Sequence, residues 1–151
     1  MLVLPARPGR RTRRKAGRKR ITMTQQTELD ITAIAARYLA VFNEPDAGIR
    51  RAAIEDIWLP DATEFVFEVQ FHGYEELEAR VIRAYQTFVA NGRYTVEGAG
   101  DVTRHGDIVM FTAQLVTPDG VVDWATRVFL LLDGDGRIRE DYQLTTKPLP
   151  A

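Results

Sequence analysis

Apolar residues near the start of the chain recur every three or four positions, which is the spacing of one helix face. Ile31, Ile34 and Tyr38 form such a series, and the phrase TELD at 27–30, just before them, is a capping-box pattern. Together these features predict a first helix from about residue 29 to residue 43.

Two further helices are predicted by the same spacing. Asp46 is a favourable N-cap residue for the second helix, which ends before Pro60. The third helix lies after Gly73 and ends at Asn91–Gly92. Its apolar face is predicted by the helical spacing of Leu77, Val81, Tyr85 and Phe88.

Strict alternation replaces the helical period elsewhere. The stretch DATEFVFEVQF, residues 61–71, predicts one strand ended by Gly73. Later, the turn signals RHGD, TPDG and DGDG divide the chain into four segments of strand length. Short turns require antiparallel neighbours, so a meander is predicted over 94–103, 108–116, 121–132 and 138–145. Helices followed by a curled sheet indicate an α+β domain with the helices on one face.

Charge divides the chain into two parts. Residues 1–20 hold nine of the twenty basic residues and no acidic one, so 21–151 keep eleven basic against 21 acidic residues. A basic tail can bind nucleic acid or an anionic membrane, but an acidic body is a poor nucleic-acid surface. The alternative is that Met23 opens the folded protein, with 1–22 a disordered tail or a misassigned start and 23–151 a single domain.

Composition excludes several chemistries. The sequence has no cysteine and no serine, so thiolate and serine nucleophiles and zinc–thiolate sites are absent. His72 and His105 are too far apart for a metal-ligand pair, and no nucleotide fingerprint occurs. We therefore expect no cofactor and no metal. The longest apolar run, VFLLL at 128–132, is too short to cross a membrane, and a cytoplasmic location is expected.

Several local phrases occur in a familiar order. They are RYLAVFNEPD at 37–46, PDAT at 60–63, the strand-ending Gly73 and LLDGDGRI at 131–138. In this order and spacing, the chain resembles the SnoaL-like branch of the nuclear-transport-factor-two-like superfamily, which includes ketosteroid isomerase and polyketide cyclases. The resemblance implies a cone-shaped α+β barrel (cystatin-like, SnoaL-like) with three helices against a curved, mainly antiparallel sheet and an apolar pocket. Since this fold serves many functions, it does not decide the activity.

The resemblance also implies catalytic candidates. In isomerase-like members, a helical tyrosine donates a hydrogen bond to the oxyanion, and Tyr38 is its match. The aspartate base and the second, neutral acid of those enzymes fall on Val66 and Val128 here, so both are missing. Glu64 and Glu68 share the parity of Val66 and are the candidate replacements.

Other residues are candidates by position. His72 ends the predicted strand near the expected pocket mouth, and histidine is a common acid or base in catalysis, so it is a candidate acid or base, or else a surface histidine. Trp124 shares parity with Val128 and is a candidate for stacking on a flat ligand. The remaining candidate pocket residues, each with a packing role as the alternative, are Trp58, Val66, Tyr85, Val128 and Tyr142.

The strand at 61–71 presents a conflict between its two faces. The resemblance directs Glu64 and Glu68 toward the pocket, whereas patterning alone buries Phe65, Phe67 and Phe71. Both hold if a second subunit covers the phenylalanine side, so a homodimer through the sheet is predicted. A bulge in the strand is the alternative.

Two functions remain open from the sequence. One is a cofactor-independent isomerase, cyclase or hydrolase acting on a small apolar molecule, with Tyr38, His72, Glu64 and Glu68 as its catalytic residues. The other is a non-catalytic binding or dimerisation module of the same fold. The valines at both expected acid positions favour the second.

Overall fold

The structure, a computed structural model, describes residues 31–151. The basic tail at 1–22, the start at Met23 and the capping box at 27–30 lie outside the described residues. No helix within the described part is long and apolar enough to cross a bilayer.

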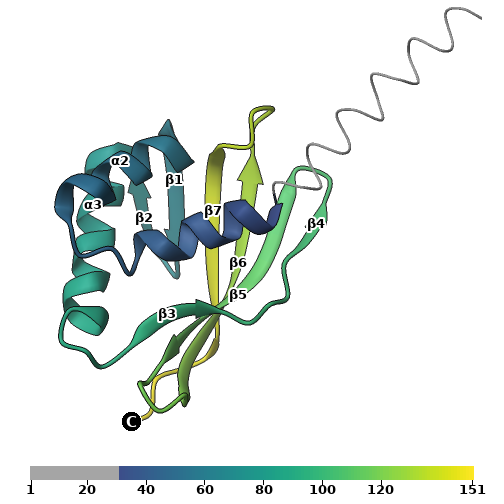
Figure 1. Cartoon of the computed structure of the whole chain (residues 1–151). Helices are drawn as coiled ribbons and strands as arrows, with labels where there is room; N and C mark the ends of the chain where they lie inside the picture. The colour runs from purple at the N-terminus through teal and green to yellow at the C-terminus, as the bar shows by residue number, and fades with distance from the viewer. Residues whose placement is uncertain (1–30) are drawn as a thin grey trace, which may run out of the picture. The chain divides into compact units, whose positions relative to one another are not determined.

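The first described helix covers residues 31–41, and its inward face is buried. In Figure 1 it is the dark blue helix that crosses in front of the sheet. Contacts confirm the packing, because the Tyr38 ring lies edge-on to Phe111 at 5.5 Å and its hydroxyl reaches Asp141 on another strand. This helix therefore packs against the inner, concave face of the sheet.

The second helix, α2 (Ala47–Ile57), begins as predicted, because Asp46 caps it by accepting a hydrogen bond from the Ile49 amide at 2.8 Å. It ends earlier than its apolar pattern suggests. Trp58 already has extended backbone angles and opens strand β1 (Trp58–Val66). Pro60 explains the early end, since a proline disfavours helical geometry in the residue before it.

The predicted strand at 61–71 is wrong in one respect, because it is a hairpin. Strand β1 turns at Phe67 and Glu68, and β2 (Val69–His72) returns antiparallel with Val66 opposite Val69. Phe67 takes a left-handed φ of 54° in the turn. Neither turn residue is a Gly, Asn or Asp, so the usual hairpin signal is missing.

This turn resolves the conflict between the two faces. Residues opposite each other in a hairpin point to the same side, and Glu64 lies opposite Phe71 while Phe65 lies opposite Gln70. Glu64 and Phe71 therefore share the inner face, and Phe65 lies on the outer one. Apolar and polar residues keep alternating through the turn. However, Phe65 of β1 lies on the outer face, whereas Phe71 of β2 lies on the inner face.

Helix α3 (Gly73–Ala84) packs Leu77 and Val81 into the core. It continues directly into a π-helical turn, η1 (Tyr85–Val89). Figure 1 shows α2 and α3 together on the β1–β2 side of the sheet. The π turn matters for the site, because π turns inside helices often occur at functional positions.

The sheet has the order β2-β1-β7-β6-β5-β3, with β4 also paired to β5. Its C-terminal strands follow the predicted meander closely: β5 (Ile108–Val116), β6 (Val122–Leu132) and β7 (Ile138–Lys147). The first predicted strand is instead two short ones, β3 (Thr95–Gly98) and β4 (Thr103–His105). Gly100, with φ of 78°, lies in the break between them.

One pairing could not be read from turn signals. Strand β1 lies parallel to β7 and thereby joins the N-terminal hairpin to the meander. All other pairs are antiparallel. The fold is therefore α+β, with three helices against a curved, mainly antiparallel sheet.

Two neighbouring rows of side chains define the faces of this sheet. Across β1, β7, β6 and β5 the inner row, in register, is Glu64, Asp141, Leu130 and Val109. All four are at most 1% exposed. The next row, on the outer face, is Phe65, Tyr142, Phe129 and Met110.

Candidate functional site

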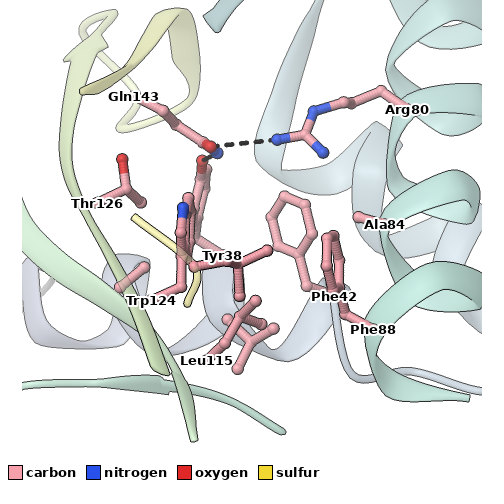
Figure 2. A pocket seen from close by; sticks show the side chains of 12 residues that line it. Tyr38, Phe42, Arg80, Ala84, Phe88, Leu115, Trp124, Thr126 and Gln143 are labelled. Carbon is pink, nitrogen blue, oxygen red and sulfur yellow. Dashed lines mark hydrogen bonds between the residues drawn. The ribbon is translucent and has the colours of Figure 1, made fainter. Parts of the chain in front are cut away.

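A cavity of about 140 Å³ lies between the helix at 31–41, the α3–η1 helix and the inner face of the sheet. Figure 2 shows its labelled side chains arranged around a common space. The lining residues are Tyr38, Phe42, Arg80, Ala84, Phe88, Val96, Ala113, Leu115, Trp124, Thr126, Gln143 and Leu149.

Most of the wall is apolar, and the sequence pattern explains why. Ala113 and Leu115 alternate along β5, and Trp124 continues the inward parity on β6. Phe88 reaches the cavity from the π turn, and Phe42 reaches it from the C-terminal end of the first helix (Figure 2). The result is a hollow in which an apolar ligand would lose contact with water.

Polar groups gather at one end of the cavity around the Tyr38 hydroxyl. This hydroxyl donates to Asp141 Oδ1 at 3.1 Å and accepts a hydrogen bond from Gln143 Nε2 at 2.7 Å. Glu64 Oε2 lies 3.4 Å away. Burial raises the pKa of Tyr38 well above its ordinary value, and the neighbouring carboxyl groups of Asp141 and Glu64 raise it further. Tyr38 therefore keeps its proton and acts as a hydrogen-bond donor.

Arg80 closes the network from helix α3. Its Nε donates to Glu64 Oε1 at 2.9 Å, and its Nη2 donates to Gln143 Oε1 at 3.1 Å. Figure 2 shows the Gln143 amide between the Tyr38 hydroxyl and the Arg80 guanidinium. The Glu64 side chain is only 1% exposed, so this ion pair balances a charge that is buried away from water.

Asp141 is the neutral member of the buried acid pair. Burial, the charge of Glu64 and a hydrogen bond to the Glu64 side chain raise the pKa of Asp141 well above 3.8. Its Oδ2 has no hydrogen-bond partner within the described part of the chain. Asp141 thus holds a proton one hydrogen bond behind Tyr38, while Glu64 holds the negative charge beside Arg80.

Two groups at the cavity have unused hydrogen-bond capacity. Thr126 is 1% exposed, and its Oγ1 has no partner within residues 31–151. Arg80 uses Nε and Nη2, while its Nη1 bonds to none of the described residues. Both residues line the cavity.

The predicted site residues fall into three positions. Tyr38 and Trp124 line the cavity. Glu64 is buried behind the cavity wall, in contact with Tyr38 and Arg80. Trp58 and Val128 are fully buried core residues that do not line it.

The other predicted residues lie away from the cavity lining. The exposed His72 bonds to Thr63 Oγ1 at 2.8 Å, and Glu68 lies in the hairpin turn. The Tyr85 ring lies beneath the Arg50 guanidinium at 4.8 Å. Val66 lies on the inner face of the sheet but does not line the cavity. The prediction that Tyr142 lines the pocket is wrong, because Tyr142 lies on the outer face, where its ring stacks on Phe65.

Sequence reasoning missed Arg80, Thr126, Asp141 and Gln143. A signal existed for the last two, because β7 alternates polar Asp141 and Gln143 with apolar Tyr142 and Leu144. Patterning directs the apolar pair inward, whereas the structure directs the polar pair inward. No cluster of three potential metal-ligating side chains occurs among residues 31–151.

The sequence matches no family model and no curated protein. Solved structures do match. A predicted isomerase of the SnoaL-like family from Agrobacterium tumefaciens superposes with a TM-score of 0.70 at 26% identity, over 78% of this chain and 97% of that one. The chain has the SnoaL-like, nuclear-transport-factor-two-like fold.

Two more distant structures agree with the SnoaL-like fold. A predicted polyketide cyclase from Sinorhizobium meliloti has a TM-score of 0.57 at 17% identity, covering 76% of this chain and 96% of its own. A nuclear-transport-factor-two-like protein from Exiguobacterium has a TM-score of 0.55 at 19% identity, covering 74% and 97%. Their varied descriptions mean that function must be argued from the cavity itself.

Proposed function

We propose that this SnoaL-like protein binds a small apolar molecule in the cavity and presents it to the Tyr38 hydroxyl. The observation that carries the proposal is an apolar hollow with a buried hydrogen-bond network around the Tyr38 hydroxyl at one end. An apolar wall with a few fixed polar groups is typical of small-molecule binding sites.

The activity that this arrangement supports is hydrogen-bond or acid catalysis at an oxygen of the ligand. Tyr38 keeps its proton, and the neutral Asp141 lies behind it. When a ligand oxygen accepts from Tyr38, Asp141 with its proton on Oδ1 donates to the phenol oxygen, which lies 3.1 Å away. A proton can then move toward the ligand and leave Asp141 ionised. Isomerisation, cyclisation and hydration of oxygenated compounds all include such a step.

Non-catalytic binding is the second candidate, and a specific feature favours it. Among the described residues, no carboxylate lines the cavity, because Glu64 and Asp141 lie behind Tyr38, Arg80 and Gln143. A base that removes a proton from carbon must reach its substrate. His72 and Glu68 also lie outside the lining, so neither has a role in this proposal.

Tyr38→Phe distinguishes the two candidates. We expect the variant to bind the same apolar ligands, as measured by calorimetry, but to lose at least tenfold in turnover of any ligand that the wild-type protein converts. His72→Ala is the matched control and should change neither. Equal turnover by wild type and Tyr38→Phe would remove the catalytic proposal and leave the binding module.

We also propose that a second copy of the chain covers the outer face of the sheet. Phe65 and Tyr142 stack there with ring centres 4.6 Å apart, and Leu144 is 60% exposed. Phe67 at the hairpin tip is 79% exposed. Apolar groups gathered in this way favour burial, and one face can pair with itself about a two-fold axis.

Sedimentation equilibrium at micromolar concentration tests the homodimer. The wild-type protein should sediment as a dimer, and Leu144→Lys should sediment as a folded monomer. A wild-type monomer would overturn this part of the proposal without affecting the cavity. A cytoplasmic location and the absence of nucleic-acid binding outside residues 1–20 remain predictions.

A further inference from the structure

The cavity is small for a ligand site. Its volume of about 140 Å³ is well below the roughly 300–1,000 Å³ of pockets that hold drug-sized molecules. It is close to the roughly 150 Å³ of an apolar protein cavity that holds one benzene molecule. A ligand held here therefore has about one six-membered ring within the walls.

The unsatisfied hydroxyl of Thr126 indicates what else the ligand carries. A buried polar group without a partner destabilises the protein, and Oγ1 of Thr126 is such a group at the cavity wall. Rotation about χ1 can move the hydroxyl into the position that the methyl group now holds, so the hydroxyl can turn to a ligand. A ligand oxygen that accepts from Thr126 would remove this penalty, and an all-carbon ligand would not.

Charge in the network opposes an anionic ligand. Arg80 is the only cation among the lining residues, and its charge is already balanced by Glu64 at 2.9 Å. An added carboxylate would lie in an apolar hollow close to the Glu64 charge without a cation of its own. Burying an unbalanced charge is far more costly than burying a neutral carbonyl.

We infer that the cavity selects an uncharged compound of about one ring whose carbonyl oxygen, as in a ketone, aldehyde or lactone, accepts a hydrogen bond from Thr126 as well as from Tyr38. This inference rests on the proposed binding function. It narrows the ligand class in both size and charge, and it assigns Thr126 as the residue that determines specificity.

Three probes of nearly equal size test the inference by calorimetry on the full chain: acetophenone, ethylbenzene and benzoate. We expect acetophenone to bind about tenfold more tightly than ethylbenzene, the factor that corresponds to about 1.4 kcal/mol. Benzoate at neutral pH should bind more weakly than both.

Thr126→Val removes the hydroxyl while keeping the shape of the side chain. It should reduce acetophenone affinity toward that of ethylbenzene and leave ethylbenzene affinity unchanged. Thr146→Val, at an exposed position on the neighbouring strand β7, is the control and should change neither.

Different outcomes would overturn this inference and the proposed binding function. Equal binding of acetophenone and ethylbenzene, or an unchanged acetophenone affinity in Thr126→Val, would overturn the role of Thr126 while the cavity still binds ligands. Tight benzoate binding would overturn the charge selection. Binding of a steroid but of none of the three probes would overturn the size limit. Failure of all three probes, a steroid and a terpene to bind would overturn the proposed function, and the inference with it.

Discussion

Asp141 and Glu64 lie opposite each other on the parallel strands β7 and β1, and both side chains are withdrawn from water. Two carboxyl groups placed this way cannot both ionise without a large cost, so one of them keeps its proton. Arg80 pairs with Glu64, which leaves the proton with Asp141. The Tyr38 hydroxyl therefore has a neutral acid, Asp141, as its hydrogen-bond partner on the side away from the cavity.

Asp141→Asn should alter how stability depends on pH. With its pKa raised, Asp141 keeps its proton in the folded state while the unfolded chain loses it above about pH 3.8. The folded state then binds more protons, so the free energy of unfolding falls as pH rises, by up to about 1.4 kcal/mol per unit, until the folded pKa is reached. Asparagine mimics the neutral acid and removes this fall. In urea unfolding, the free energy of unfolding of the variant relative to the wild type should be larger at pH 7 than at pH 5.

Asp101→Asn provides a control of opposite sign. Burial opposes ionisation of Asp101, but hydrogen bonds from Thr112 and the charge of Arg127 outweigh it and lower its pKa. Its contribution is therefore present above its unfolded pKa and is lost as pH falls through the folded value. Asp101→Asn should lose stability at pH 7 and less at pH 3. A stability difference for Asp141→Asn that stays constant with pH would contradict the neutral-acid assignment.

Tyr38→Phe should destabilise the protein through the network rather than through packing. The ring stays, but Asp141 Oδ1 loses its donor and Gln143 Nε2 loses its 2.7 Å acceptor. Buried groups left without partners cost about 1–3 kcal/mol. Tyr94→Phe, which removes a part-buried hydrogen bond to Asp123, is the matched comparison and should cost less. If Tyr38→Phe and Tyr94→Phe lowered the free energy of unfolding equally, the buried network would contribute no more stability than a part-buried hydrogen bond.

Arg80→Met should be the most destabilising of these changes. It leaves the buried Glu64 charge without its ion pair, and breaking a buried pair in this way costs about 3–5 kcal/mol. Glu64→Gln in the same chain removes the stranded charge, so the double variant should recover much of the loss. Arg51→Met, which breaks two more exposed pairs, with Glu55 and Glu78, should cost less than Arg80→Met. A double variant no more stable than Arg80→Met would contradict the charge explanation.

Ala84→Leu should fill part of the cavity. Ala84 lines it from helix α3, and added methyl groups in an apolar void typically raise stability by about 0.5–2 kcal/mol. The same change should weaken binding of acetophenone. Ala79→Leu, at an exposed position of the same helix, should alter neither the melting temperature nor the affinity by much. Tighter binding in Ala84→Leu would show that the ligand occupies another place.

Local patterns in the sequence were sufficient for most of the elements. Helical spacing marked the faces of the helices at 31–41 and in α3, and Asp46 marked the start of α2. Turn signals delimited β5, β6 and β7 to within a few residues. These features succeed because side-chain direction along one helix or strand repeats with a period set by the backbone alone.

The composition of the site was decided by tertiary structure. Tyr38 and Asp141 lie 103 positions apart in sequence, yet their oxygens are within hydrogen-bond distance because the first helix crosses β7. The parallel pairing of β1 with β7 brings Glu64 to the same place, and the turn at Phe67 brings Phe71 to the same inner face. Alternation in a strand gives two faces but not which of them is buried. That choice depends on what packs against each face, and here a tyrosine, an arginine and a glutamine make the polar face the inner one.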